Sequence, residues 1–579
     1  MTSDLDLDAE PPPELPPGLP SLPPLDRPLG SVDHRLRRTG PDRPVTVRGR
    51  RAMVRVGDGG VRTLWLPTPM ATGLGVRAAG RELLETPLGV ERTVGVGGSE
   101  VIERTVVSRD APVIWLEWVA AGAPVRLDLS WRVGTRSHGT GLPASAAAVE
   151  PDGVTGIAWR QAGRGLLVAG RDGRRTAYVA GPVVDGWDVE PVDGALEVRV
   201  RAGVTEHGFR LAVASAGPRD DLERLLRIAG RTGVAVRARE GAVSRVLASG
   251  LAVSAPDPEL GRAVEWARTR LDTAPGPVWR LEEAVQGALA LLAAGEPDPV
   301  RSMLHRLADG SGGRGRVPGG MVGADPVFRE DGRAELLFLL LAARYLAWSG
   351  DRQGVRGIWD VIAQAAGTAL AAPDADEALL RAVAAELAVA AEEVGEDELA
   401  ARLAAAAGPR PTEAPLAIDT PDPDPGDPAG LAASAGPEQL RPSAGTGFAA
   451  EGAVIRTVVE QLLGARPDAP RGRLVLRPRP GDRHRFEVRG LVVGDTAVTV
   501  AYRRDGRVHR LTVRQERGGA PLQLVLEPEL RGQKIAASRV DGEEADLDAR
   551  RTDHGWRVPV QMVLDQPRTL EVEFAGGSA

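Results

Sequence analysis

The sequence contains no cysteine, a single lysine, and few tyrosine or phenylalanine residues. Without cysteine the chain has no disulfide framework, no thiol nucleophile and no cysteine-based metal site. The single lysine, Lys534, stands among 72 basic residues, and a GC-rich genome explains this bias better than any binding site does. The seven histidines are scattered without a metal-ligand spacing, so we expect no metal and no cofactor.

An excess of basic charge is also missing, because the net charge is -7 and the pI is about 5.8. This argues against a nucleic-acid partner, whose phosphates usually bind clustered basic residues. Residues 1–27 are acidic and proline-rich, and they have neither the basic region nor the apolar region of a secretory signal. The longest apolar run, Leu336–Ala343, is too short to span a bilayer. We therefore predict a cytoplasmic protein that binds neither nucleic acid nor membrane.

Changes in hydrophobic period divide the 579 residues into several segments, as expected for a chain too long for one core. Alternating apolar runs between turn signals predict strands, whereas apolar spacings of three and four predict helices. The predicted fold class is β + α + β, with an N-terminal β-sandwich, a helical domain and a small C-terminal β-domain. The predicted boundaries are 1–28 for a disordered proline-rich tail, 29–216 for the sandwich, 217–250 for a linker helix and its connection, 251–464 for the helical domain with a loop-rich insert at 408–447, and 465–579 for the C-terminal β-domain.

Local start, stop and packing signals mark the helical domain. Asp257-Pro258 combines an N-cap residue with a proline at the first helical position. Residues 333–349 are apolar nearly all round, as in a helix buried inside a bundle. Trp266, Trp348 and Trp359 fall on apolar helix faces, so we expect them in the core. Further helical patterns at 352–370, 376–394, 396–407 and 448–463 bring the expected number of helices to about nine.

Four stretches of the chain resemble one family. They are Leu260–Asp272, Pro275–Glu283, Ala343–Asp351 and Gly464–Pro478. With the β, helix-pair, β order, they are similar to glycogen-debranching amylo-1,6-glucosidases and glucoamylases, which are six-hairpin glycosidases. The resemblance implies an (α/α)6-toroid-like helical domain, here incomplete, and a carbohydrate partner, either an α-glucan or an oligosaccharide. It also implies inverting hydrolysis, in which an acid protonates the leaving oxygen and a carboxylate about 6.5–9.5 Å away activates water.

The resemblance places a candidate site near the starts of two helices. The catalytic candidates are Glu283, Asp331 and Glu335, and the substrate-binding candidates are Trp279, Arg280, Glu282, Asp325, Arg314 and Arg316. Trp279 would supply an aromatic platform for a sugar ring. The glycine-rich loop 309–320, with its two arginines, would cradle a sugar or a phosphate, or would be a flexible connection between helices.

Each acidic candidate also has a structural interpretation. Glu282 and Glu283 would complement the helix dipole if they lie in the first turn of a helix. Asp331 suits an N-cap position, Asp325 suits a turn, and Glu335 suits a polar pairing inside the bundle.

One feature of the family is missing between Leu370 and Gly447. In the enzymes that the chain resembles, the catalytic acid lies near an aromatic motif in a mid-toroid loop. Here residues 373–407 are rich in alanine, leucine and glutamate, and residues 408–447 contain no aromatic residue. A complete toroid of this family also has twelve helices, whereas about nine are expected in this chain. The sequence therefore leaves three hypotheses open: a glycosidase, a relative that binds carbohydrate or protein without catalysis, and a phosphorylase or lyase on the same scaffold, with the oligomeric state undetermined.

Overall fold

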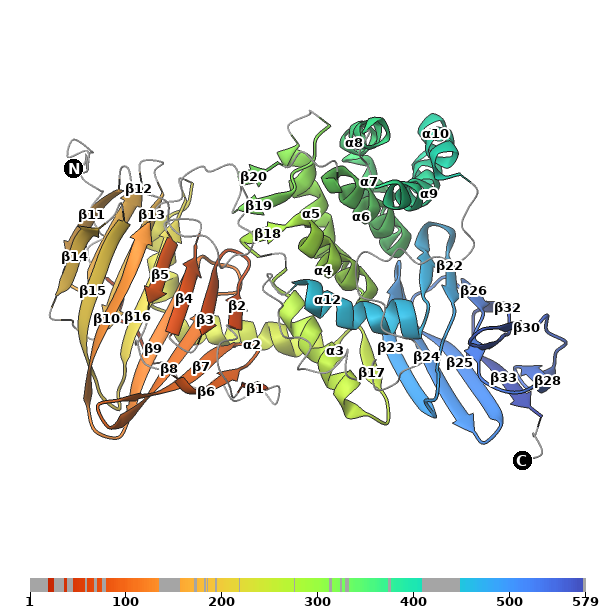
Figure 1. Cartoon of the computed structure of the whole chain (residues 1–579), viewed down its shortest axis with the longest axis horizontal. Helices are drawn as coiled ribbons and strands as arrows, with labels where there is room; N and C mark the ends of the chain where they lie inside the picture. Colours follow the sequence, from red (N-terminus) through yellow and green to blue (C-terminus); the bar gives the residue numbers. More distant parts are fainter. Residues whose placement is uncertain are drawn as a thin grey trace. The chain divides into compact units, whose positions relative to one another are not determined.

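The computed structural model describes residues 19–24, 36–38, 45–57, 60–66, 70–74, 80–134, 157–170, 174–181, 184, 186–192, 195–217, 219–274, 276–311, 315–322, 325–328, 333–372, 376–408 and 448–575. The chain forms two compact units (Figure 1). Unit 1 comprises Met1–Arg245, Asp272–Trp279 and Met321–Val327, and unit 2 comprises Val246–Leu271, Arg280–Gly320 and Phe328–Ala579.

Unit 1 contains the predicted β-sandwich, which is built from two antiparallel sheets (Figure 1). The first sheet has nine strands in the order β1 Leu36–Arg38, β6 Gly80–Glu85, β7 Gly89–Val96, β8 Ser99–Val107, β9 Val113–Ala121, β16 Phe209–Ala216, β13 Arg175–Gly181, β12 Gly165–Gly170 and β11 Ile157–Ala162. The second has seven strands in the order β14 Trp187–Val192, β15 Ala195–Val204, β10 Val125–Gly134, β5 Met70–Leu74, β4 Gly60–Trp65, β3 Met53–Gly57 and β2 Val45–Arg48.

Aromatic rings from both sheets fill the sandwich core. Trp131 of β10 packs on Tyr178 of β13 with ring centroids 5.4 Å apart, so rings from opposite sheets meet. Trp115 and Trp118 of β9 point to opposite faces of the strand, yet both are buried. Trp118 belongs to the core between the sheets, whereas the indole Nε1 of Trp115 donates to the carbonyl oxygen of Ala229 at 2.9 Å. Strand β9 is therefore covered on both faces.

Two helices follow the sandwich, where the sequence predicts one. Helix α1 Leu222–Ala229 begins after the N-cap residue Asp221 and ends at Gly230, as its local signals predict. Helix α2 Thr232–Ala248 buries four of its residues, so it lacks the apolar stripe that would reveal it in the sequence.

The predicted tail 1–28 includes six residues that the structure describes, Leu19–Pro24. Leu22 is buried, with 5% of its surface exposed. Two arginine side chains of the sandwich donate hydrogen bonds to carbonyl oxygens of this segment. This part of the proline-rich region therefore lies against the folded sandwich.

Unit 2 contains the helical domain. Its α-helices within the described residues are α3 Pro258–Leu271, α4 Leu281–Ala293, α5 Pro297–Gly310, α6 Arg333–Ser349, α7 Arg352–Arg356, α8 Trp359–Ala371, α9 Glu377–Val394, α10 Asp397–Ala407 and α12 Phe448–Arg456, which continues as the π-helix η2 Thr457–Leu462. Helix α6 packs against α4, α5, α8 and α9, and most of its residues are buried. This confirms the prediction of an interior helix at 333–349.

The helical pattern predicted at 352–370 is two helices in the structure. Gly357 ends α7, with its backbone N–H bonded to the carbonyl oxygen of Gln353, and α8 begins at Trp359. Glycine has a low helix propensity, which favours a break at this point. Residues 409–447, nearly all of the predicted insert, lie outside the described residues. No described helix is both long and apolar enough to cross a membrane.

The C-terminal β-domain also belongs to unit 2. Its main sheet has the order β17 Ala252–Ser254, β23 Arg485–Val493, β24 Thr496–Asp505, β25 Val508–Arg517, β33 Arg568–Phe574, β28 Ile535–Val540 and β29 Glu543–Glu544. Two smaller sheets are β21 Arg466–Asp468, β22 Arg473–Leu476, β26 Leu522–Leu526 and β32 Val560–Leu564, and β27 Glu529–Leu530, β31 Gly555–Arg557 and β30 Arg550–Thr552. The predicted order of β-sandwich, helical domain and C-terminal β-domain is confirmed.

Candidate functional site

The predicted site lies around the start of α4. A small sheet precedes it, with the strand order β18 Val278–Arg280, β19 Gly320–Val322 and β20 Asp325–Val327. The backbone N–H of Leu281, the first residue of α4, donates to the carbonyl oxygen of Gly319 at 2.9 Å. The glycine-rich loop and the start of α4 are therefore neighbours, as a shared site would require.

Trp279, the predicted aromatic platform, is fully enclosed, with 0% of its surface exposed. A ring that stacks on a sugar needs one face open to the ligand. In this structure Trp279 instead packs inside the protein. Arg280, the N-cap residue of α4, is half-buried and makes no side-chain capping bond.

Glu282 and Glu283 lie in the first turn of α4, and both are half-buried. The backbone N–H groups of a first turn carry a partial positive charge, so two carboxylates stabilise this helix end. The placement agrees with their structural interpretation. It also keeps both carboxylates on the helix end that is bonded to the glycine-rich loop.

Glu335 has a defined structural partner. It lies in the first turn of α6, and 3% of its surface is exposed. Its Oε1 accepts a hydrogen bond from the backbone N–H of Val317 at 3.1 Å. Val317 is itself buried, so the carboxylate satisfies an amide that water does not reach. Glu335 thus fixes the end of the glycine-rich loop against α6.

We expect Glu335→Ala to lower the free energy of unfolding by about 1–3 kcal/mol, because it leaves the buried Val317 N–H without its acceptor. Glu335→Gln keeps an acceptor oxygen in the same place and should lower the free energy of unfolding by less than Glu335→Ala does. Urea unfolding of both variants measures the difference. Equal losses in the two variants would show that the Val317 bond is not what Glu335 contributes.

The remaining predicted residues are only partly described. Arg316 is exposed. Arg314 and Asp331 lie outside the described residues, as does the side chain of Asp325. Phe328, which follows β20, was not predicted, although 43% of its surface is exposed. Its signal in the sequence is an aromatic residue that stands between two candidate acids, Asp325 and Asp331. Within the described part of the chain, no three histidine, aspartate or glutamate side chains converge as metal ligands.

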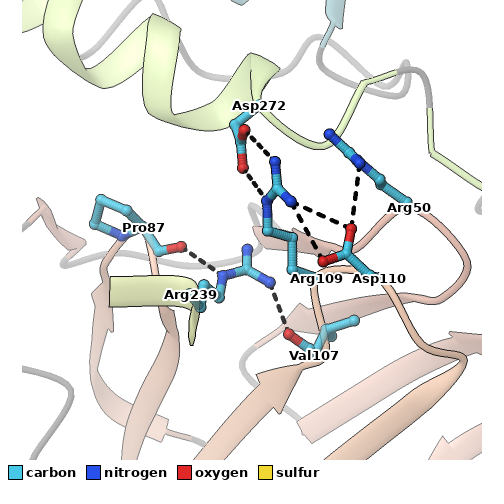
Figure 2. Close-up of polar contacts among 7 residues, drawn as sticks. All are labelled: Arg50, Pro87, Val107, Arg109, Asp110, Arg239 and Asp272. Carbon is cyan, nitrogen blue, oxygen red and sulfur yellow. Dashed lines mark hydrogen bonds and ion pairs between the residues drawn. The ribbon is translucent and has the colours of Figure 1, made fainter. Parts of the chain in front are cut away.

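A different polar cluster lies in unit 1 (Figure 2). The Nε and Nη2 of Arg109 donate to the two carboxylate oxygens of Asp272 at 2.6 and 2.7 Å. The Nη1 of Arg109 bonds Asp110 at 3.3 Å, and Asp110 also pairs with Arg50. Burial would raise the pKa of Asp272, but the hydrogen bonds and charge of Arg109 bring that pKa below its usual value. The four side chains form a chain of ion pairs.

Arg239 of α2 lies beside these ion pairs and is 8% exposed (Figure 2). Its Nε donates to the carbonyl oxygen of Pro87 at 2.9 Å, and its Nη1 donates to that of Val107 at 2.7 Å. The charged groups of the cluster thus pair with one another or bond to backbone carbonyls. This pattern is typical of a structural contact. No local pattern in the sequence indicates this cluster, since 163 residues separate Arg109 from Asp272.

No protein-family profile and no curated protein matches this sequence. Several solved structures are similar to it in fold. A bacterial glucoamylase complexed with acarbose is 10% identical, with 67% of this chain and 68% of that chain covered and a TM-score of 0.40. A candidate kojibiose phosphorylase from the human microbiome is 6% identical, with 92% of each chain covered and a TM-score of 0.49. An α-L-rhamnosidase from Dictyoglumus thermophilum is 10% identical, with 82% and 73% covered and a TM-score of 0.41.

Proposed function

We propose that this chain is a glycosidase-like protein that binds an oligosaccharide without cleaving it. The observation that carries the proposal is the burial of Glu335 and its hydrogen bond to the backbone. This predicted catalytic acid is buried, and its carboxylate accepts a bond from the Val317 N–H. A general acid or base must reach the substrate or a water molecule, and a carboxylate in this position holds a loop instead.

The placement of the other acids supports the same proposal. Glu282 and Glu283 complement the N-terminal end of α4, which gives them a role in stability without any substrate. The stretch from Leu370 to Gly447 also lacks the aromatic-acidic motif of the enzymes that the sequence resembles.

The ligand-binding part of the proposal rests on exposed side chains of unit 2. Arg316 and Phe328 are both exposed; in the sequence Arg316 precedes β19 and Phe328 follows β20. A guanidinium donates several hydrogen bonds to hydroxyl groups, and an exposed aromatic ring offers an apolar face to a pyranose. These two residues replace the enclosed Trp279 as the candidates for sugar contact.

Hydrolysis by inversion of an α-glucan is the second candidate function. One observation favours it, namely that Glu282 and Glu283 are half-buried beside the glycine-rich loop. In that case Glu283 and an acid from the 325–335 region would share the acid and base roles.

The purified wild-type chain should bind an α-glucan or an oligosaccharide, but it should release no glucose or maltose from a panel of α-glucans. Affinity electrophoresis measures binding, and reducing-sugar release measures hydrolysis. Phe328→Ala should weaken binding by roughly tenfold, as loss of one exposed anchor does. Trp159→Ala, which removes an exposed aromatic side chain of unit 1, is the matched control and should leave binding unchanged.

Two variants decide between the candidate functions. Sugar release by the wild-type chain that disappears in Glu283→Gln or Asp331→Asn would overturn the proposal in favour of hydrolysis. Absence of binding to every glycan tested, together with absence of hydrolysis, would overturn it as well.

A further inference from the structure

The segment Leu19–Pro24 of unit 1 has the sequence Leu-Pro-Ser-Leu-Pro-Pro. Its contacts come from several elements of the sandwich that are far apart in the sequence. The Nη2 of Arg164 donates to the carbonyl oxygen of Leu19 at 3.1 Å, and the Nη1 of Arg210 donates to that of Leu22 at 3.2 Å. In both bonds a side chain of the sandwich is the donor and a backbone carbonyl of the segment is the acceptor.

Two glycines make room for the segment. A Cβ atom built on Gly181, at the end of β13, would lie 3.3 Å from the Cβ of Leu22. A Cβ atom built on Gly230 would lie 2.6 Å from the Cβ of Pro20, which is closer than real contacts allow. Leu22 and Pro20 therefore occupy space that any larger residue at these two positions would take.

We propose that the sandwich carries a binding site for an extended, proline-rich peptide, and that its own segment Leu19–Pro24 fills this site. Proline-rich segments favour the polyproline II conformation, whose backbone carbonyls have no internal hydrogen bonds and remain available to donors. Arg164 and Arg210 supply such donors, and the buried Leu22 supplies a side-chain anchor. The site goes beyond the proposed glycan function and does not depend on it.

The absence of cysteine allows a clean test in the full-length chain. Ser21 is exposed, so Ser21→Cys gives a single thiol in the segment for a nitroxide spin label. If the segment is bound, the label should show a restricted spectrum. A label as mobile as in the denatured chain would overturn the proposal directly.

Two variants then remove the contact from opposite sides. Leu22→Asp removes the anchor, and Gly230→Ala places a methyl group where Pro20 lies. Gly230 has φ -71° and ψ -5°, a conformation that alanine adopts readily, so this variant should displace the segment and leave α1 folded. Leu22→Asp should lower the ratio of restricted to mobile label by roughly tenfold or more, as expected for loss of a buried leucine. Gly230→Ala should also lower this ratio, because its methyl group takes the space of Pro20.

Pro24→Asp is the matched control, because it adds the same charge to the same segment at a side chain that is exposed. It should leave the spectrum unchanged. A label that stays restricted in folded Leu22→Asp and Gly230→Ala chains would overturn the proposed contacts, and circular dichroism checks that both have folded. Arg164→Gln, which removes only a donor to Leu19, provides a further variant if Leu22→Asp does not fold.

A synthetic peptide of sequence Leu-Pro-Ser-Leu-Pro-Pro tests whether the site can bind a separate peptide or holds the segment only as part of the same chain. At millimolar concentration it should bind the Leu22→Asp chain, whose site is empty, and should not bind the Gly230→Ala chain. Nuclear magnetic resonance of the peptide detects this binding independently of any glycan. Failure to bind the folded Leu22→Asp chain would overturn the assignment of a peptide site.

Discussion

Replacing Arg92 with methionine should lower the free energy of unfolding by about 3–5 kcal/mol. Arg92 and Glu103 are opposite each other on β7 and β8, and their side chains are 0% and 1% exposed. The Nη2 of Arg92 donates to the Oε2 of Glu103 at 2.8 Å, and the indole of Trp118 donates to the same oxygen at 3.0 Å. Methionine would leave a buried carboxylate without its cation. Urea unfolding followed by tryptophan fluorescence measures the loss.

Two controls test whether the buried charge is the cause. The double variant Arg92→Met/Glu103→Leu removes both charges and should recover most of the lost stability. Arg201→Met breaks the cross-strand pair with Asp128, whose two side chains are 78% and 86% exposed, and should change stability by less than about 1 kcal/mol. A double variant as unstable as Arg92→Met would indicate a packing defect instead.

Several element boundaries could be predicted from the sequence because their signals are local. The Oδ1 of Asp257 accepts the N–H of Glu259 at 2.9 Å, and α3 begins at Pro258, as the N-cap and proline signals predict. Gly230 ends α1 in the same way. Such signals act within one or two turns of a helix, so the sequence contains them in full.

Helix α2 shows why other elements could not be predicted. Val234 is 55% exposed and Arg239 is 8% exposed, whereas their hydrophobicity favours a buried valine and an exposed arginine. Arg239 is buried because its guanidinium bonds backbone carbonyls of Pro87 and Val107, which lie 152 and 132 residues away. A hydrophobic period cannot reveal a face whose burial depends on such distant partners.

The candidate site was predictable to a similar extent. Residue spacing placed Glu282 and Glu283 in a first helical turn, and the structure agrees. It could not show that Trp279 is enclosed, because burial depends on tertiary packing. Nor could it show that Glu335 bonds the Val317 amide, because that bond depends on how the loop folds back on α6. The sequence therefore indicated on which helices the candidate side chains lie, but not which groups they contact.

A histidine in the C-terminal β-domain should make stability depend strongly on pH. His509 is 2% exposed, and its Nδ1 lies 2.9 Å from the hydroxyl oxygen of Tyr502. Burial, assisted by the charge of Arg504, lowers the pKa of His509 from 6.5 to about 4. The unfolded chain therefore binds more protons than the folded chain between these values. Folding stability should fall by up to about 3 kcal/mol as the pH drops from about 6.5 to about 4.

The variant His509→Gln isolates this effect, because glutamine can bond Tyr502 but does not titrate. Urea unfolding at several pH values should show a shallower loss of stability for His509→Gln than for the wild type, with the difference confined to the interval from pH 6.5 to 4. His484→Gln, which changes an exposed histidine of the same domain, is the matched control for the substitution itself. Parallel curves for His509→Gln and the wild type would mean that the folded domain accepts the proton as readily as the unfolded chain does. The buried ring would then have to be solvated or to find an acceptor on protonation, since a charge left among Tyr502 and Phe574 without either is costly.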